Sequence, residues 1–287
     1  MARTGFKVAL QYALPHRFLS RVVLWATRWT FAPWKNFLIG QILRRYRVDL
    51  SEAQNPDAFS YPHFNAFFTR ALKPGARPFP AEPDAIICPA DGRVGQAGAI
   101  EDGRLLQAKG QSFSAAELLG DADAAQAYAG GSFLTVYLSP RDYHRVHMPL
   151  AGELVETVHI PGRIFSVAPF AVAAIPRLFA RNERLVCHFR GEHGPFAVVL
   201  VGAMLVSGIE TVWRGVEVPP YASAITRRDY RNGAVRLARG AEMGRFNMGS
   251  TAIVLVPAQI GRISGALAPE QAVRVGERIG VETLVKM

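Results

Sequence analysis

The feature that most restricts the fold is a series of short apolar runs between residues 85 and 256. Eight such runs are separated by glycine, aspartate or proline, and each has the length and composition of a β-strand. They are residues 85–88, 93–97, 133–138, 152–160, 185–188, 196–201, 209–212 and 251–256. Helical pieces are expected at residues 117–119 and 122–128. This pattern predicts an α+β fold with an antiparallel, β-rich body.

The first fifty residues have a different character. Nine basic residues and one acid, Asp49, give this segment eight of the ten net positive charges of the chain. The basic residues are Arg3, Lys7, Arg17, Arg21, Arg28, Lys35, Arg44, Arg45 and Arg47. Bulky residues such as Trp25 and Trp29 interleave with them, and residues 36–47 have the period of an amphipathic helix.

Such a segment is typical of helices that lie in the interface of an anionic membrane. No run approaches the roughly 18–20 uncharged residues needed to span a bilayer, and no signal peptide is present. The alternative is a helical layer packed on the core, with its basic face in water. We predict that residues 1–60 are basic amphipathic helices that associate with an anionic membrane surface.

The composition and the motifs argue against several other classes. With 49% hydrophobic and 20% charged residues, the chain is expected to fold around a sizeable core. Cys88 and Cys187 lack the spacing of a zinc site or a disulfide framework. His144 and His147 are three residues apart, but no further ligand at metal spacing accompanies them. We expect no metal, and no nucleic acid partner because no nucleic-acid-binding motif is present.

Three stretches supply residues for nucleophilic chemistry. Asp91 lies in a turn after an apolar run, His144 and His147 follow another run, and Ser250 follows Gly249 directly before a third. A serine after glycine can attack the carbonyl that precedes it and turn the amide into an ester, because glycine has no Cβ to hinder the approach. Elimination from that ester breaks the chain and leaves a pyruvoyl group, an electrophilic ketone, at the new N-terminus.

The same aspartate, histidine and serine would suit a serine hydrolase that acts on lipids, since triads are recognised by geometry and not by order. The common hydrolase motif Gly-x-Ser-x-Gly is absent, because Met248 and Ala252 flank Ser250 at those positions. A third alternative is a basic binding protein that carries out no chemistry at all. The hydrolase would use Ser250, His147 and Asp91 in an uncut chain.

Six separated motifs between about Tyr61 and Val256 resemble those of bacterial phosphatidylserine decarboxylase. They are Pro89-Ala90-Asp91-Gly92, Gln107-Ala108-Lys109-Gly110, the segment Tyr137–Pro149, Phe179-Ala180-Arg181-Asn182-Glu183-Arg184, Gly208-Ile209-Glu210-Thr211-Val212-Trp213, and Glu242-Met243-Gly244-Arg245-Phe246 continued through Gly249-Ser250-Thr251. One departure is Met248, where the family usually has leucine, and this apolar swap conserves volume.

The resemblance implies a carboxy-lyase that is made as a proenzyme and generates its own pyruvoyl cofactor. Asp91, His147 and Ser250 would match the self-cleavage triad, in which His147 takes the proton of Ser250. Cleavage between Gly249 and Ser250 would give a β chain, 1–249, and an α chain, 250–287. Residues 61–287 would form the decarboxylase domain.

The resemblance also implies the reaction and its surroundings. The amine of phosphatidylserine would form a Schiff base with the pyruvoyl group, lose carbon dioxide and be released as phosphatidylethanolamine. His144 would match the proton donor and a substrate contact, with a pKa suited to neutral pH. Ser166 would match a position near the head group. The β and α chains would form a heterodimer, with a dimer of these as the assembly, peripheral on the cytoplasmic face of the cell membrane.

Overall fold

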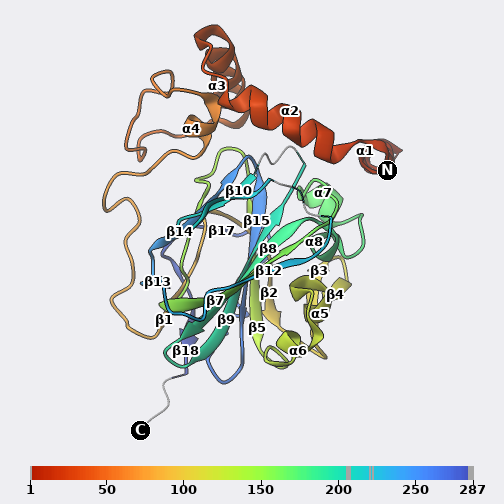
Figure 1. Ribbon diagram of the computed structural model, residues 1–287, viewed down its shortest axis with the longest axis vertical. Coiled ribbons are helices and arrows are strands. Elements are labelled where there is room, and N and C mark those ends of the chain that lie inside the picture. The colour runs from red at the N-terminus through yellow and green to blue at the C-terminus, as the bar shows by residue number, and fades with distance from the viewer. Residues whose placement is uncertain (1, 205–207, 220, 222, 284–287) are drawn as a thin grey trace.

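A computed structural model describes residues 2–204, 208–219, 221 and 223–283. The chain begins with helices that lie across one end of a layered β body (Figure 1). These helices are α1 (Ala2–Ala13), α2 (His16–Arg28), α3 (Ala32–Tyr46) and the short α4 (Phe64–Phe68). Pro33 lies in the first turn of α3, where its missing N–H costs nothing. Arg47, with a φ of 50°, ends that helix in the left-handed conformation.

The centre of the body is a nine-stranded sheet in which all pairs are antiparallel. Its strand order is β12-β7-β8-β9-β15-β5-β2-β17, and β13 also pairs with β7. The bounds are β2 (Gly92–Ala99), β5 (Ser132–Leu138), β7 (Gly152–Ile160), β8 (Arg184–Gly191), β9 (Gly194–Gly202), β12 (Thr226–Asp229), β13 (Arg236–Leu237), β15 (Ser250–Val256) and β17 (Ala272–Val273). The strand β15 is central, with β5 on one side and β9 on the other.

Two smaller sheets cover one face of this sheet and enclose the first core cluster. One sheet has the order β11-β10-β14-β6 and the other β1-β18-β16. Their strands are β1 (Ala85–Ile87), β6 (Arg145–His147), β10 (Gly208–Thr211), β11 (Gly215–Val218), β14 (Glu242–Asn247), β16 (Gly261–Ile263) and β18 (Arg278–Glu282). Val146, Phe246, Leu138 and Ala252 are fully buried members of this cluster. Alternate residues of β15 thus point into the space between the two layers.

Short helices and a hairpin cover the opposite face and enclose the second cluster. They are β3 (Arg104–Ala108), β4 (Gln111–Ser114), α5 (Ala115–Leu119), α6 (Ala122–Gln126), α7 (Pro169–Val172) and α8 (Leu178–Arg181). The other residues of β15, such as Ile253 and Leu255, point into this cluster. Because β15 is buried on both faces, its residues from Ala252 to Val256 form an unbroken apolar run and do not alternate.

The predicted α+β class with an antiparallel, β-rich body is confirmed. Each of the eight predicted runs forms a strand, with bounds that differ by up to three residues, and both predicted helical pieces are present. The helix expected at residues 36–47 spans Ala32–Tyr46. The predicted boundary after residue 60 lies beside a third core cluster, in which Ile39 and Ala58 pack with aromatic residues of α4.

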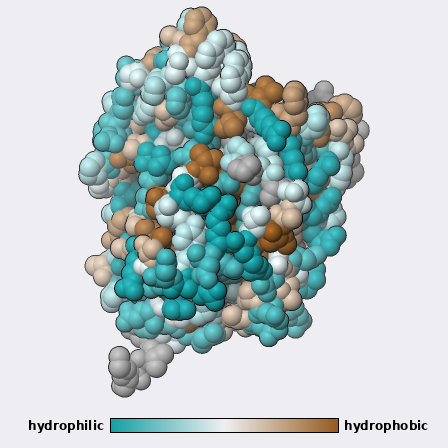
Figure 2. Space-filling view, viewed as in Figure 1, coloured by the Kyte–Doolittle hydropathy of each residue, from teal (hydrophilic) through white to brown (hydrophobic). Residues whose placement is uncertain are grey.

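The N-terminal helices expose several large hydrophobic side chains to solvent. Phe6, Phe18 and Trp25 are 70%, 65% and 64% exposed. Figure 2 shows hydrophobic side chains among hydrophilic ones at the upper end of the molecule, where Figure 1 places these helices. Within the described residues, every helix is too short or too polar to cross a lipid bilayer.

Candidate active site

The predicted scissile bond lies where the chain passes from one sheet to the other. The strand β14 ends at Asn247 in the smaller sheet, and β15 begins at Ser250 in the large one. Only Met248 and Gly249 make this corner, with φ values of 80° and 35°. A side chain with a Cβ is strained at a positive φ, by about 1–3 kcal/mol. The corner therefore holds strain at Met248, whereas Gly249 adopts its positive φ without a steric cost.

The side chain of Ser250 is fully buried and points into the space between the layers. It shares a strand face with Ala252 and Val254, which belong to the first core cluster. Its backbone lies opposite Leu138 of β5 and Gly202 of β9. Among the described residues, Ser250 Oγ has no hydrogen-bond partner. A buried hydroxyl without a partner costs free energy, and it is free to take part in a reaction; Thr251 Oγ1 beside it also has no partner, so this feature alone does not distinguish Ser250.

The His147 ring is held by two hydrogen bonds that define its tautomer. The carbonyl oxygen of Gly240 can only accept, so His147 Nδ1–H donates to it at 2.8 Å. The other nitrogen, Nε2, then accepts from the Tyr143 hydroxyl at 3.1 Å. Burial lowers the pKa of His147, because it disfavours the charged imidazolium. The ring is therefore neutral at pH 7 and has a basic lone pair on Nε2.

The Asp91 carboxylate is bound by groups other than the predicted histidine. Arg77 contacts both of its oxygens, with Nε at 3.0 Å from Oδ1 and Nη2 in a close ion pair with Oδ2. The backbone N–H of Val275 also donates to Oδ1, at 2.8 Å. Within the described part of the chain, no hydrogen bond joins Asp91 to His147 or His147 to Ser250.

The strand pattern adds a further separation. Val146 points into the first core cluster, so its neighbour His147 points to the other face of β6. Ser250 points into that cluster from the opposite layer. The structure thus places Asp91, His147 and Ser250 at the same end of the two layers, but within the described residues it does not form the hydrogen bonds of a triad. The roles of these residues stay predictions.

His144 is buried and neutral. Its Nε2–H donates to the carbonyl oxygen of Ser139 at 3.1 Å, and its ring stacks on Phe68 with centroids 4.0 Å apart. Burial, with a smaller effect of the Arg70 charge, lowers the pKa of His144 to about 3. The expectation that this histidine titrates near neutral pH therefore does not hold in the uncleaved chain. Its role as proton donor stays a prediction, and the proton that it holds is on Nε2.

Ser166 lies under the first helix. Its backbone N–H donates to the side-chain oxygen of Gln11 in α1 at 2.8 Å, and its hydroxyl accepts from the N–H of Ala168 at 3.3 Å. No contact that the structure describes joins Ser166 to Ser250 or His144. Its place near the head group stays a prediction.

Several polar residues around the site have no role in the sequence-based prediction. Arg77 lies between α4 and β1, in a segment that contains Pro74, Pro78 and Pro80, and Tyr143 lies within the motif Tyr137–Pro149 but has no predicted function. Asn247 ends β14 and binds Asn65 and Glu210. Asn247 is two residues before Gly249, and this closeness to the predicted scissile bond is the one feature of the sequence that could have indicated it. The partners of Arg77 and Asn247 are distant in sequence and could not be found from it.

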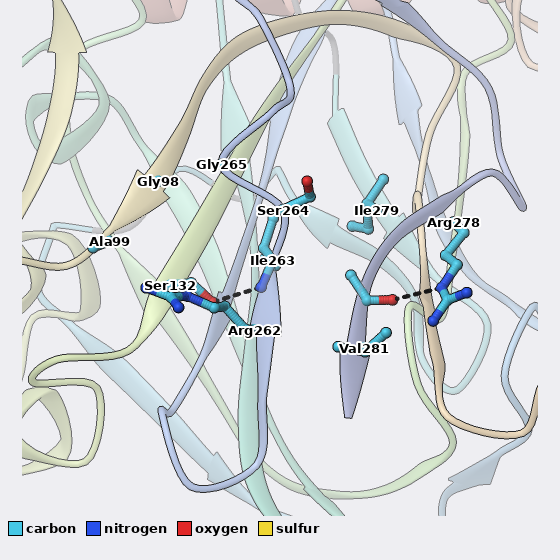
Figure 3. A pocket seen from close by; sticks show the side chains of 11 residues that line it. Gly98, Ala99, Ser132, Arg262, Ile263, Ser264, Gly265, Arg278, Ile279 and Val281 are labelled. Atoms are coloured by element: carbon cyan, nitrogen blue, oxygen red, sulfur yellow. Dashed lines mark hydrogen bonds between the residues drawn. The ribbon is translucent and has the colours of Figure 1, made fainter. Parts of the chain in front are cut away.

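Two cavities help to locate the site. The larger, about 620 Å³, lies against β16 and β18 (Figure 3). The residues that line it include none of the predicted site residues. Its polar groups are largely engaged: Ser132 Oγ accepts from the N–H of Ile263 at 2.9 Å, and Arg278 Nε donates to the Gly280 carbonyl at 3.4 Å. A second cavity, about 300 Å³, is lined by Asp91, Tyr143 and several arginines, so it is the one that adjoins the predicted site.

Comparison with known proteins identifies the family. A family model for phosphatidylserine decarboxylase matches residues 64–281, which is most of the chain. The chain belongs to the phosphatidylserine decarboxylase family. A second family model, described as PSD, matches residues 6–47. The resemblance seen in the six sequence motifs is thereby confirmed, and membership of this family favours a decarboxylase over a serine hydrolase.

Curated relatives of this family match almost the whole chain. The phosphatidylserine decarboxylase proenzyme of Xanthomonas axonopodis pv. citri is 60% identical over 272 residues, which cover 94% of this chain and 97% of the relative. The proenzyme of Xanthomonas campestris pv. campestris is also 60% identical, with 94% and 96% covered. That of Xylella fastidiosa is 54% identical over 275 residues, with 96% and 94% covered.

A proenzyme of this family implies a pyruvoyl cofactor, and the residues of the corner fit its formation. Ser250 would supply the three carbons, Gly249 would supply an unhindered carbonyl, and the serine hydroxyl has no hydrogen-bond partner among the described residues. Beside Ser250, Gly202 of β9 presents no side chain. The strand β15 would hold the group by its pairing with β5 and β9.

Proposed function

We propose that this chain is a proenzyme that cuts itself between Gly249 and Ser250 and then decarboxylates phosphatidylserine to phosphatidylethanolamine. The observation that carries this proposal is the two-residue corner, in which a strained Met248 and the conformationally free Gly249 precede a buried serine without a hydrogen-bond partner among the described residues. Strain in the ground state lowers the barrier for a reaction that releases it. The products would be a β chain, 1–249, and an α chain, 250–287.

His147 and Asp91 are proposed to activate Ser250 for this cleavage. His147 is neutral, and its Nε2 lone pair is the basic atom that can take the hydroxyl proton. The Tyr143 hydroxyl now occupies that lone pair at 3.1 Å, so the base must exchange this partner before it acts. The Asp91 carboxylate would stabilise the imidazolium, and Arg77 and the Val275 N–H fix its position.

When formed, the pyruvoyl group supplies an electrophilic ketone that withdraws electrons from a substrate attached to it. His144 is proposed to deliver a proton. Its neutral ring keeps Nε2–H on the Ser139 carbonyl, so it must first take up a second proton on Nδ1, which has no hydrogen-bond partner among the described residues, and it returns to the neutral form when it gives that proton away. Its stacking on Phe68 and its bond to Ser139 fix the orientation of the ring. Ser166 is proposed to lie near the head group, at the boundary between the body and α1.

Residues 1–60 are proposed to bind the anionic surface of the membrane that contains the substrate. Exposed aromatic side chains on α1–α3 can enter the head-group region, and arginines between them can pair with lipid phosphates. Trp25 and Trp29 stack with centroids 5.2 Å apart, so they form one apolar surface. The enzyme would be peripheral on the cytoplasmic face of the cell membrane, with residues 61–287 as the decarboxylase domain and a dimer of β–α pairs as the assembly.

The activity is tested with the purified protein and vesicles that contain phosphatidylserine. We expect carbon dioxide and phosphatidylethanolamine in equal amounts, with no added cofactor. Release of free serine or fatty acid without carbon dioxide would instead indicate a lipid hydrolase and contradict the proposal. A carbonyl reagent such as phenylhydrazine should abolish the decarboxylation, because the proposed cofactor is a ketone.

The membrane role is tested by changing Phe18 and Trp25, which are 65% and 64% exposed, to serine. These side chains lie in solvent, so their loss should not unfold the chain. Binding to anionic vesicles should weaken by about tenfold or more, since burial of each large apolar side chain contributes roughly 1.5–3 kcal/mol. Added salt should weaken wild-type binding further. The matched control is Phe79→Ser, an exposed aromatic outside the helices; vesicle binding unchanged by Phe18→Ser/Trp25→Ser would refute this role.

A further inference from the structure

A buried polar network holds the chain directly before the predicted scissile bond. Asn247, the last residue of β14, is fully buried. Its side-chain nitrogen Nδ2 donates to Glu210 Oε1 of β10 at 2.7 Å. Its side-chain oxygen Oδ1 accepts from Asn65 Nδ2 of α4 at 2.9 Å. Both ends of this one amide are thus fixed, one by the smaller sheet and the other by a helix.

The same network reaches the N-terminal helices. Arg28 Nη2, in the last turn of α2, donates to Glu210 Oε1 at 3.1 Å. The other oxygen, Oε2, lies 4.0 Å from Arg245 Nε. Met248 packs against the third core cluster, which contains Ile39 of α3 and aromatic residues of α4. One face of the corner is therefore held by polar contacts and the other by apolar contacts with the helical layer.

These contacts act on the half of the scissile bond that no strand pairing fixes. Asn247, which pairs with Gly208 of β10, is the last paired residue of β14, and the next paired residue is Ser250 in the other sheet. Between them the path of Met248 and Gly249 depends on where Asn247 is placed. A carbonyl must be held within a few tenths of an ångström of its attacking group, and a displacement of about 1 Å can cost a hundredfold in rate.

We propose that Asn65 and Glu210 are positioning residues for self-cleavage, which hold Asn247 so that the Gly249 carbonyl is presented to Ser250 Oγ. The inference rests on the proposed cleavage between Gly249 and Ser250, and it adds the residues that set its rate. Glu210 acts as an acceptor for Asn247, and its charge toward Arg28 is secondary. Through Asn65 and Arg28, the helices proposed to bind the membrane also support the geometry of the bond that matures the enzyme.

The experiment follows newly made full-length chains in cell-free translation, with the conversion to two chains measured over time by denaturing gel. Asn65→Ala and Glu210→Ala remove the anchor from its two sides, and each should slow cleavage by about tenfold or more. Glu210→Gln keeps an oxygen at the same place to accept from Asn247 Nδ2, so its cleavage should stay within about threefold of wild type. This rescue is not expected of a residue that acts only through its charge.

A matched control separates positioning from general stability. Glu153 has a similar exposure to Glu210, 21% against 24% for the side chains, and pairs with Arg236 at 3.2 Å in a different sheet. Glu153→Ala should cleave at the wild-type rate. Thermal unfolding of each variant, measured in a Ser250→Ala background in which no chain is cut, gives the stability of the precursor. Slow cleavage by Asn65→Ala and Glu210→Ala at a melting temperature near that of Glu153→Ala supports the proposal.

Three results would overturn it. They are wild-type rates for both Asn65→Ala and Glu210→Ala, a Glu210→Gln variant as slow as Glu210→Ala, or equally slow cleavage by Glu153→Ala. A different result addresses the proposed function itself: if wild-type chains stay uncut, or Ser250→Ala chains are cut, the cleavage mechanism fails before its positioning residues come into question.

Discussion

The two sides of the Gly249–Ser250 bond are held in different ways. Ser250 begins a central strand that is paired along both edges and buried on both faces. Gly249 and Met248 are outside the strands, and their positions depend on positive φ angles and on side-chain contacts of Asn247 and Met248. The nucleophile is thus placed by the backbone of the sheet, and the carbonyl is placed by side chains and local conformation.

This difference suggests how substitutions on each side should behave. Strand pairing on both sides holds the backbone of residue 250, so substitutions there should act through the loss of the hydroxyl and be all-or-none. Changes at Met248, Gly249 and their supports alter the approach of the carbonyl and should adjust the rate by degrees. Substitutions at Ser250, at Met248 and at the two histidines test that division.

Ser250→Ala should abolish cleavage completely, because the chain then lacks the attacking oxygen. The product should remain one chain and have no decarboxylase activity, as measured by denaturing gel and by carbon dioxide release. The matched control is Thr251→Val, since Thr251 is equally buried but points to the other face of β15. This variant should still be cut before Ser250. A cut Ser250→Ala chain would disprove the mechanism.

His144→Ala should separate the two reactions. The His144 ring is not a predicted member of the cleavage triad, so the variant should still form two chains. Decarboxylation should fall by about a hundredfold or more, which is the usual contribution of a general acid. Gel analysis and carbon dioxide release on the same sample check both parts. If this variant fails to cleave while His147→Ala cleaves normally, the roles of the two histidines are reversed.

Met248→Gly and Met248→Ala should differ in the rate of cleavage. Both remove the side chain from the third core cluster, but only glycine relieves the strain at a φ of 80°. If roughly 1 kcal/mol of strain promotes the reaction, Met248→Ala should be cut about fivefold faster than Met248→Gly. Met248→Leu keeps both strain and volume and should resemble wild type. Equal rates for the glycine and alanine variants would show that strain at residue 248 plays no part.

The pH dependence of cleavage should be weak above neutrality. His147 acts as a base only when it is neutral, and burial lowers its pKa from 6.5. Protonation therefore stops the base only below that value, and the rate should be constant from about pH 7 to 8 and fall as the medium becomes acidic. Cleavage of freshly translated chains in buffers of different pH checks this. A midpoint above pH 7 would contradict the role of His147.

The sequence predicted the β body well because the strands carry their own local signals. The run before Val256 is apolar throughout, as a strand buried on both faces must be, and it was identified to within one residue. The corner was not predictable in this way. It exists because β14 and β15 pair in different sheets, and that assignment depends on partners far away in sequence.

For the candidate site, the sequence supplied candidate residues, whose roles stay predictions, but it did not supply their contacts. Ser250, His147 and Asp91 came from motifs, whereas the ion pair of Asp91 with Arg77 and the bond of His147 to Tyr143 depend on the folded chain. Asn65 and Asn247 are 182 residues apart and meet only because α4 packs over the end of β14. The low pKa of His144 likewise follows from its complete burial, which its sequence neighbours do not indicate.

The most direct test of self-processing is the intact mass of the purified wild-type protein under denaturing conditions. We predict two chains, the smaller comprising residues 250–287 and lighter by one ammonia than the unmodified peptide, as conversion of serine to pyruvoyl requires. A single chain of 31.4 kDa from protein that decarboxylates phosphatidylserine would contradict the account, because the reaction would then proceed without the cofactor that cleavage supplies.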